Sequence, residues 1–390
     1  MTGHFDIMVA GGGIVGLTAA LAMASRGFKV AVLDGSPLTT DCKEFDPRVY
    51  AINLASQELL EKLGVWQQLD KSRRSPYRHM HVWDAMNKAS IDFDARMIVA
   101  NALGHILEES ILKTALLKQV EAQEKITVFA RTKVEKVEQK EENIAIESTS
   151  HTWTAQLLMI ADGANSFCRQ LLKVPLITWP YHQEAIVALV NTEKPHQQTA
   201  YQVFNPDGPL AFLPLADDHL CSIVWSTTPA HAKRLMHAAE HDFSEELTIA
   251  FAHRLGQVSV RSTRYCFPLT MRHAKNYSGK SWILLGDAAH TIHPLAGLGL
   301  NVGLADVATW LGCLDNTANK ISNRALGSYQ RQRKSAVWQI IALMGGLKTL
   351  FSNPLSPVIA LRGAGLRICN NINALKKFFI AQAAGKSVEP

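Results

Sequence analysis

Residues 284–301 read LLGDAAHTIHPLAGLGLN and decide how the rest of the chain is interpreted. The apolar run Trp282–Leu285 predicts a strand that breaks at Gly286-Asp287. A loop with one proline and two glycines then leads into a predicted helix from about Leu300. Such glycines let a flat ring lie against bare backbone, and the start of the helix favours negative charge in front of it. A plain strand–turn–helix is the alternative for this segment alone.

The amino-terminal stretch Ile7–Gly16 (IMVAGGGIVG) carries a second pattern. Asp6–Ala10 predicts a buried strand, Ile14–Arg26 a helix, and Lys29–Leu33 a second strand that ends at Asp34. Three glycines in the order G-x-G-x-x-G therefore lie between a strand and a helix. An acid follows about 20 residues further on, as in a dinucleotide-binding fingerprint.

Each part of this fingerprint has a physical role. Gly11 allows the tight turn, Gly13 lets a pyrophosphate approach the backbone, and Gly16 lets the helix pack on the strand. Asp34 can accept hydrogen bonds from ribose hydroxyls. A bare G-x-G-x-x-G is weak evidence, but between a strand and a helix it predicts a bound ADP moiety.

The composition is that of a globular protein with a large core. The chain has 390 residues, of which 47% are hydrophobic and 19% charged, so we expect two closely joined domains. Its six cysteines are scattered without a C-x-x-C pair, which favours neither a disulfide framework nor a zinc site and suggests a reducing cytosol. Residues 7–25 are uncharged, but their glycine cluster argues against a membrane span, and we expect none elsewhere.

The positive charge of the chain is concentrated at its carboxyl end. The net charge is +6, and the segment from residue 331 onward has Glu389 as its only acid. Its nine basic residues are Arg331, Arg333, Lys334, Lys348, Arg362, Arg367, Lys376, Lys377 and Lys386. We expect helices at Ser335–Leu350, Val358–Asn371 and Leu375–Ala384. A basic, apolar-rich tail suggests an anionic partner or a membrane surface, and a solvated helical surface is the alternative.

The sequence disfavours a nucleic-acid partner and a nicotinamide dehydrogenase. The chain has no basic patch interleaved with aromatic residues and no nucleic-acid recognition motif, so we expect no nucleic acid. After Asp34, a nicotinamide dehydrogenase would continue with further strand–helix units, whereas this chain continues as DPRVYAIN over residues 46–53. Arg48 stands out there because its planar guanidinium suits a phosphate or a cofactor edge. A surface salt bridge is the alternative for Arg48.

The middle of the chain predicts a second layer and a third turn near the cofactor. Tyr77–Phe93 alternates apolar and polar residues like strands, and Leu103–Glu121 predicts a helix. The apolar strand Leu157–Ile160 then leads into Asp162-Gly163. An acid and a glycine directly after a buried strand fit a turn on the cofactor side of the sheet.

Gly11–Gly16, Asp162-Gly163 and Gly286-Asp287 occur in the order and spacing of three signatures of the single-component aromatic-ring flavoprotein monooxygenases, the para-hydroxybenzoate hydroxylase class. Within that class the chain resembles the ubiquinone-biosynthesis hydroxylases over nearly its whole length. The supporting segments are RVYAINLASQELLEKLGVW (48–66), LGHILEESIL (103–112), IADGANS (160–166), GPLAFLPL (208–215), SIVWS (222–226) and GDAAHTIHPLAG (286–297). SIVWS and LEKLGVW are most similar to the 2-polyprenylphenol 6-hydroxylase subfamily.

The resemblance implies an α/β fold with a Rossmann-like FAD-binding domain of discontinuous segments, a β-sheet substrate domain and a helical carboxyl-terminal tail. The expected FAD-binding segments are 1–74, 101–175 and 271–330. The expected substrate-domain segments are 75–100 and 176–270, followed by the basic helical tail 331–390. In this class FAD occupies the fingerprint, and NAD(P)H binds transiently without a fold of its own.

By the same resemblance, Asp162 and Gly163 lie near the pyrophosphate and the approach of the nicotinamide, and Asp287 holds the ribityl or pyrophosphate region. Pro294 would lie beside the flavin edge where oxygen reacts. The residues expected to contact the isoalloxazine are Gly297, Leu298, Gly299 and Asn301. Two residues depart from the usual pattern. Asp34 replaces a glutamate, and a leucine at position 298 replaces a glutamine and so removes a polar side chain near the flavin.

The expected substrate pocket lies on the alternating strands of the second domain. Its candidate residues are Phe204, Leu213, Pro214, Val224, Trp225 and Phe267, for which ordinary sheet core is the alternative. His290 and His293 form an H-x-x-H pair, but no carboxylate or cysteine cluster completes it, so we expect no metal. His293 is a candidate to deprotonate a phenol or, alternatively, to hydrogen-bond from behind the site.

The implied reaction is hydroxylation of the aromatic ring of a polyprenylphenol in ubiquinone biosynthesis, with NAD(P)H and O2 and through a flavin C4a-hydroperoxide. A flavin-dependent isoprenoid reductase or dehydrogenase would share the fingerprint. A non-catalytic flavoprotein scaffold of the biosynthetic complex is a third interpretation, indicated by Leu298. The tail would serve a homo-oligomer, other ubiquinone-biosynthesis proteins or a membrane surface. We expect a cytoplasmic protein, either free or peripheral to the inner face of the cytoplasmic membrane.

Overall fold

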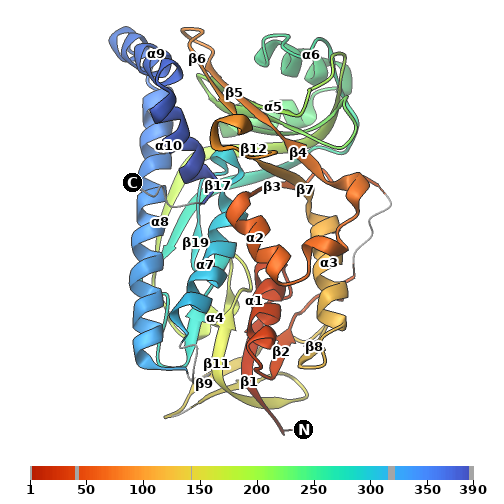
Figure 1. Cartoon of the computed structure of the whole chain (residues 1–390), viewed down its shortest axis with the longest axis vertical. Coiled ribbons are helices and arrows are strands. Elements are labelled where there is room, and N and C mark those ends of the chain that lie inside the picture. The colour runs from red at the N-terminus through yellow and green to blue at the C-terminus, as the bar shows by residue number, and fades with distance from the viewer. Residues whose placement is uncertain (1, 40–43, 142, 315–320, 386–390) are drawn as a thin grey trace.

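The computed structural model describes residues 2–39, 44–141, 143–314 and 321–385. Two sheets are stacked along the long axis of the molecule, and the carboxyl-terminal helices run along one side of both (Figure 1). The sheet that contains the amino-terminal strand occupies the lower half of the view, and the second sheet occupies the upper half. The predicted α/β fold class is confirmed.

Parallel strands buried on both faces form the centre of the first sheet. Its strand order is β8-β2-β1-β11-β10-β9, and β18 also pairs with β11. The strands are β1 (Thr2–Ala10), β2 (Val30–Leu33), β8 (Ile126–Phe129), β9 (Lys136–Gln139), β10 (Ile144–Glu147), β11 (Thr152–Ile160) and β18 (Trp282–Leu284). Helices α1 (Ile14–Ser25) and α7 (Gly299–Cys313) pack together against this sheet. Cover on both faces explains why these strands are unbroken apolar runs.

The second sheet has the order β19-β17-β12-β15-β14-β13-β5-β6, and β16 pairs with β12. Its strands are β5 (His79–Asp84), β6 (Ser90–Asp94), β12 (Leu176–Thr192), β13 (Thr199–Asn205), β14 (Gly208–Pro214), β15 (Leu220–Thr227), β16 (Val258–Val260), β17 (Tyr265–Ala274) and β19 (His290–Thr291). Helices α5 (Pro229–His237) and α6 (Glu240–Ala250) cover part of it. Because β19 pairs with β17, the loop after β18 is bound to both sheets.

A small third sheet consists of β3 (Val49–Asn53), β7 (Gly104–Glu108) and β4 (Ser75–Tyr77). The predicted helix over Leu103–Glu121 is therefore wrong in its first part, since helix α3 (Glu109–Glu121) begins only at Glu109. A short apolar run fits a strand as well as a helix, and here pairing with β3 and β4 decides for the strand. The remaining helices of this region are α2 (Leu54–Lys62) and α4 (Phe167–Leu171).

The carboxyl-terminal helices are α8 (Asn323–Phe351), α9 (Ser356–Asn371) and α10 (Asn373–Ala383). The last two lie within two residues of the predicted helices, but α8 begins well before Ser335, and the expected domain limit at 330/331 falls inside it. Its first half packs against α7 through buried side chains such as Leu326 and Tyr329. Figure 1 shows α8 running alongside both sheets.

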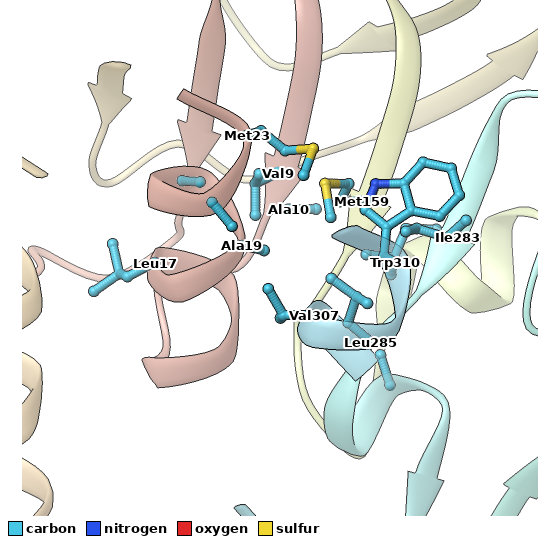
Figure 2. Packing of buried hydrophobic residues seen from close by; sticks show 14 of the residues in the cluster. Val9, Ala10, Leu17, Ala19, Met23, Met159, Ile283, Leu285, Val307 and Trp310 are labelled. Atoms are coloured by element: carbon cyan, nitrogen blue, oxygen red, sulfur yellow. The ribbon is translucent and has the colours of Figure 1, made fainter. Parts of the chain in front are cut away.

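The main core lies where α1 and α7 meet the first sheet. Trp310 of α7 is fully buried there among Met159 of β11, Ile283 of β18 and other apolar side chains (Figure 2). Large flexible and aromatic side chains fill the irregular space between the two helices and the sheet. This packing holds the turns after β1, β11 and β18 in fixed positions relative to each other.

Two arginines of the basic segment are buried in ion pairs. Arg333 Nε donates to Asp306 Oδ1 at 2.6 Å, and Arg362 Nε donates to Asp84 Oδ2 at 2.6 Å. Arg362 Nη1 also donates to the carbonyl oxygens of Leu350, Phe351 and Asn353. The prediction of a surface-exposed basic tail is therefore wrong for these two positions. Lys386 and Glu389 lie outside the described residues.

We predict that Arg362→Met lowers the free energy of unfolding by about 3–5 kcal/mol, because it leaves the buried Asp84 carboxylate without its cation. Arg367→Met, at an exposed position of the same helix, is the matched control and should change it little. Urea or thermal unfolding followed by circular dichroism measures both. Equal effects of the two substitutions would show that the buried pair does not hold α9 on the second sheet.

Candidate active site

A cavity of about 640 Å³ is lined by both main sheets. One part of its wall comes from the turns that follow β1, β11 and β18, and includes Gly13, Gly163, Gly286 and Asp287. The opposite part comes from strands of the second sheet, and includes Ala185, Val187, Leu213, Val224 and Phe267. Ligands of open α/β sheets bind at the carboxyl ends of parallel strands, and the cavity occupies that place.

The glycines of the predicted motifs have two different roles. A Cβ at Gly11, which has a φ of +106°, would collide with the carbonyl oxygen of Ala161, and one at Gly16 would collide with the oxygen of Gly11. These two glycines allow close packing of the turn. Gly13, Gly163 and Gly299 have no heavy atom within 4 Å of an added Cβ and line the cavity with bare backbone.

Unpartnered polar atoms accompany the bare backbone. Asp162 Oδ2 accepts from the N–H of Cys168 at 3.0 Å, whereas Oδ1 is buried and has no partner among the described residues. Thr291 Oγ1, in the cavity wall, likewise has none in the described part of the chain. The starts of α1 and α7 add unpaired N–H groups. These features fit a flavin dinucleotide.

The acids of the motifs differ in their surroundings. Asp34 accepts from the N–H groups of Gly12 and Ser36, each at 2.6 Å, so it holds the fingerprint turn in place while keeping free lone pairs. Asp287 faces the cavity. Burial raises the pKa of the Asp287 carboxyl above its usual value, against the opposing effect of His290 and Arg272.

Asp306 of α7 holds the Gly286-Asp287 loop from behind. Its carboxylate accepts from Gly286 N at 2.8 Å and from Arg333 Nε at 2.6 Å, and it is hydrogen-bonded to His290 Nε2 at 2.8 Å. Burial opposes its ionisation, but His290 and Arg333 outweigh burial and lower the pKa of Asp306. The loop, α7 and α8 are thus tied to one buried anion.

Two predicted flavin contacts point elsewhere in the structure. Asn301 Nδ2 donates to the carbonyl oxygen of Ala51 at 2.7 Å, and its Oδ1 accepts from Asn53 N at 3.0 Å, so it ties the start of α7 to β3. Leu298 packs against apolar side chains of two clusters and is not part of the cavity wall among the described residues. Gly297, Gly299 and Leu300 line the cavity around it.

Arg48 lines the cavity and lies on a loop that the buried carboxylate of Glu108 keeps in position. Its guanidinium lies 3.4 Å from Glu109 and 3.5 Å from Asp46. Glu108, which is 1% exposed, accepts from Arg73 Nε at 2.9 Å and Nη2 at 2.6 Å, and also from Asp46 N at 2.7 Å. The Glu108–Arg73 pair therefore fixes the segment that leads into Arg48.

Three of the six predicted substrate residues, Leu213, Val224 and Phe267, line the cavity. The other three do not line it in the described structure. Phe204 stacks on Phe351 of α8 at 3.9 Å between ring centroids, and Trp225 packs against Phe243 under α6. Pro214 contributes its carbonyl oxygen, which accepts from Ser75 Oγ at 2.8 Å. These three residues serve the packing of the sheet, which was the alternative considered for them.

His290 and His293 point in different directions. His293 Nε2 lies 3.2 Å from Gln183 Oε1, and its ring packs edge-on against Tyr181. Burial, with a smaller contribution from Lys348, lowers the pKa of His293 to about 4. A base of that strength suits a phenol poorly, which favours the hydrogen-bonding role, while Pro294 next to it lines the cavity. In the described part of the chain no group of three His, Cys, Asp or Glu could hold a metal.

Sequence reasoning missed several residues of the site. Tyr50 and Lys113 line the cavity, and Tyr50 Oη donates to Glu109 Oε2 at 3.1 Å. Glu109 and Lys113 are four residues apart, so they lie on the same face of a helix that begins at Glu109. This spacing is the sequence signal for Lys113. Glu108 and Asp306 carry no local signal, because their partners lie in other segments of the chain. Thr291 carries none, because its hydroxyl has no partner among the described residues.

We predict that Glu108→Gln weakens FAD binding by roughly tenfold, because a charge-assisted pair worth about 1.5–3 kcal/mol no longer holds the loop that presents Arg48. Glu121→Gln, at the exposed end of α3, is the control. Titration of the apoprotein with FAD, followed by quenching of flavin fluorescence, gives both dissociation constants. Equal affinities for the two variants would show that this loop does not contribute to cofactor binding.

Comparison with known proteins identifies the family to which this chain is similar. The family profile described as "FAD binding domain" matches residues 4–343. The 3-demethoxyubiquinol 3-hydroxylase of Escherichia coli (strain K12) is 34% identical over 388 residues, which cover 97% of this chain and 98% of that protein. The human mitochondrial ubiquinone biosynthesis monooxygenase COQ6 is 31% identical over 437 residues, which cover 97% of this chain and 92% of that protein.

Solved structures agree with the fold. The p-nitrophenol 4-monooxygenase PnpA of Pseudomonas putida DLL-E4 superposes with a TM-score of 0.80 at 17% identity, over 99% of this chain and 100% of that one. PqsL of Pseudomonas aeruginosa, a probable FAD-dependent monooxygenase, gives 0.77 at 20% identity, over 93% and 99%. At such identities these two structures speak for the fold alone. With the family profile and the relatives above, the chain belongs to the FAD binding domain family, within the ubiquinone-biosynthesis hydroxylases, as an FAD-dependent aromatic-ring monooxygenase.

Proposed function

We propose that this enzyme hydroxylates the aromatic ring of a polyprenylphenol in ubiquinone biosynthesis, with NAD(P)H and O2 as co-substrates. The observation that carries the proposal is one cavity, which joins a glycine-lined half at the strand ends of the first sheet to an apolar half on the second. A redox cofactor and an apolar ring would therefore meet in one space. The names of the two relatives above support the pathway.

The apolar half suits a phenol with a greasy substituent. Its wall is rich in small apolar side chains, namely Ala185, Val187, Ala200, Ala211, Leu213, Val224 and Leu269. Such a surface excludes water and leaves room for a planar ring. Gln202 and Ser226 are buried polar side chains of the same wall and are proposed to bind the phenol hydroxyl. Orientation of the ring by such contacts can supply several kcal/mol of the barrier reduction.

Bound FAD supplies the electron transfer from NAD(P)H and the activation of O2. The chain provides the setting for that chemistry. The starts of α1 and α7 direct N–H groups and positive dipole ends into the cavity, where they stabilise negative charge on a phosphate and on a ring edge. Pro294 and Leu295 close the cavity beside Gly297 and are proposed to keep water from the reacting edge.

The position of attack on the ring is left to experiment. Two fragments of the sequence are most similar to the 2-polyprenylphenol 6-hydroxylases, whereas the bacterial relative is named for position 3. The two positions differ in the orientation of the ring and not in the reaction class. Profiling the quinone intermediates that accumulate in a cell lacking this protein would identify the phenol on which it acts.

The direct test is turnover of an ortho-polyprenylphenol by the FAD-loaded enzyme under ¹⁸O₂ with NADH or NADPH. We predict ¹⁸O in the product, measured by mass spectrometry. Val224→Trp fills the apolar half of the cavity and should lower coupled hydroxylation about tenfold or more, because orientation of the ring is lost. Val128→Trp, on an exposed strand position, is the control and should leave it unchanged.

Two outcomes would contradict the proposed function. Consumption of NAD(P)H with no ¹⁸O in the product would indicate a reductase or dehydrogenase. A purified protein that cannot be reconstituted with FAD would indicate the scaffold.

We further propose that α9 and α10 bring the enzyme to the inner face of the cytoplasmic membrane. Leu361, Ile368, Phe378 and Phe379 are each at least 40% exposed on these helices, and beside them Lys377 is exposed and Lys376 is half-buried. Apolar side chains with lysines suit an anionic lipid surface. Among the described residues, no helix combines the length and hydropathy needed to cross a membrane. Self-association and other ubiquinone-biosynthesis proteins are alternative uses of this face.

We predict that replacing both Phe378 and Phe379 by serine lowers binding to vesicles of anionic lipid about tenfold or more, because two aromatic side chains no longer enter the interface. Phe167→Ser, at a half-exposed position on α4, is the control. Co-sedimentation with vesicles measures the binding, and light scattering measures the oligomeric state. Unchanged vesicle binding with loss of self-association would assign this face to a protein partner.

A further inference from the structure

Part of the cavity wall is thin. Tyr77 of β4 and Met80 of β5 line the cavity, and the same two side chains pack on their other side against an apolar cluster. The buried members of this cluster are Ala95, Leu103 and Ile380, with Phe93, Met97 and Ile98 half-buried around them. One layer of side chains therefore separates the cavity from α10, which carries Ile380.

The side chains of this layer are deformable and uncharged. Met80 faces Phe93 across the antiparallel pair of β5 and β6. Methionine is unbranched and adopts many rotamers, so it can move aside at low cost. The charged residues nearest in sequence are Arg78, Asp92 and Asp94. Arg78 and Asp94 line a separate pocket, and Asp92 is paired with His81. A hydrocarbon chain that displaced Met80 would therefore meet only apolar side chains of the cluster until it reached α10.

The outer end of this layer has an unusual backbone. Val99 ends the turn Ala95–Ile98 with a φ of +54° and is 97% exposed. A β-branched residue in the left-handed region is strained, and exposure of its side chain gives no compensating burial. This turn contacts α10, where Phe378 and Phe379 are also exposed. Apolar side chains thus continue from the cavity wall to the surface.

The size of the cavity leaves the substrate tail outside it. Sites of about 300–1,000 Å³ enclose one drug-sized ligand, and this cavity of about 640 Å³ would receive the flavin as well as the phenol ring. A polyprenyl chain does not fit beside them. If the ring enters the cavity, most of the chain attached to it lies outside, and the thin apolar wall at Tyr77 and Met80 offers it a path that stays in contact with apolar side chains.

We propose that Tyr77 and Met80 form a gate through which the polyprenyl tail of the substrate leaves the cavity, and that the tail runs through the Ala95–Leu103–Ile380 cluster to emerge between Val99 and α10. The proposal rests on the proposed function and adds the path of the substrate tail to it. The ring is held on the cofactor side of the gate, and the tail remains in contact with apolar side chains up to the surface. The exposed phenylalanines of α10 receive it there.

The test compares two probes on the FAD-loaded full chain, o-cresol and ortho-hexaprenylphenol. Met80→Trp puts a rigid ring into the gate, and Met86→Trp, at an exposed position of the β5–β6 turn, is the matched control. The dissociation constant of each phenol is measured from the change in flavin absorbance. We expect Met80→Trp to raise the constant for ortho-hexaprenylphenol by about tenfold or more relative to that for o-cresol, because burial of the tail is lost.

Ile380→Trp fills the same cluster from α10 and replaces Met80→Trp if the latter does not retain FAD, with the same expectation. A parallel change for both phenols, or for neither, would overturn the proposed path. The failure of the proposed function is a separate result, in which the wild-type enzyme hydroxylates neither phenol. The ratio of the two constants depends only on where the tail lies.

Discussion

One buried anion, the carboxylate of Asp306, is the interaction on which the site depends. It is 0% exposed and binds the backbone of Gly286, the ring of His290 and the guanidinium of Arg333. Gly286 lies in the turn after β18, His290 in β19 and Arg333 in α8, so one side chain of α7 positions three segments at once. Removing a partner would leave a charge in the core without compensation, which is far more costly than losing a surface pair. The geometry of the cavity wall is therefore set by a group that lies outside the cavity.

The sequence predicts the local parts of this fold well and the long-range parts poorly. The two strand–turn–helix units at the fingerprint and at Gly286 follow from apolar runs interrupted by glycine, whereas the α/β class is implied by the resemblance to a known family. The sequence predicts helix at Gly104–Glu108, because only pairing with β3 and β4 distinguishes a strand from a helix there. Arg333 and Arg362 looked like surface charges because their acids lie 27 and 278 residues away.

The same limit applies to the site. The sequence predicts the positions of the glycines because each turn requires a glycine locally. Side chains on sheet strands face either the cavity or the core, and which face they take depends on the strand register, which cannot be read from the sequence. Leu298 shows what this means. Its neighbours are apolar side chains, among them Leu295 and Met344, so leucine packs there where a glutamine would need a hydrogen-bonding partner. The departure from the usual Gly-Gln-Gly thus has a reason in the packing of this chain.

The pair between Asp84 and Arg362 also bears on how the protein is made. Asp84 belongs to β5, near the start of the second sheet, while its cation is supplied almost at the end of the chain. On the ribosome this carboxylate stays without its cation until α9, 278 residues further along, has emerged, so α9 can dock on the second sheet only after all the strands of that sheet have been made.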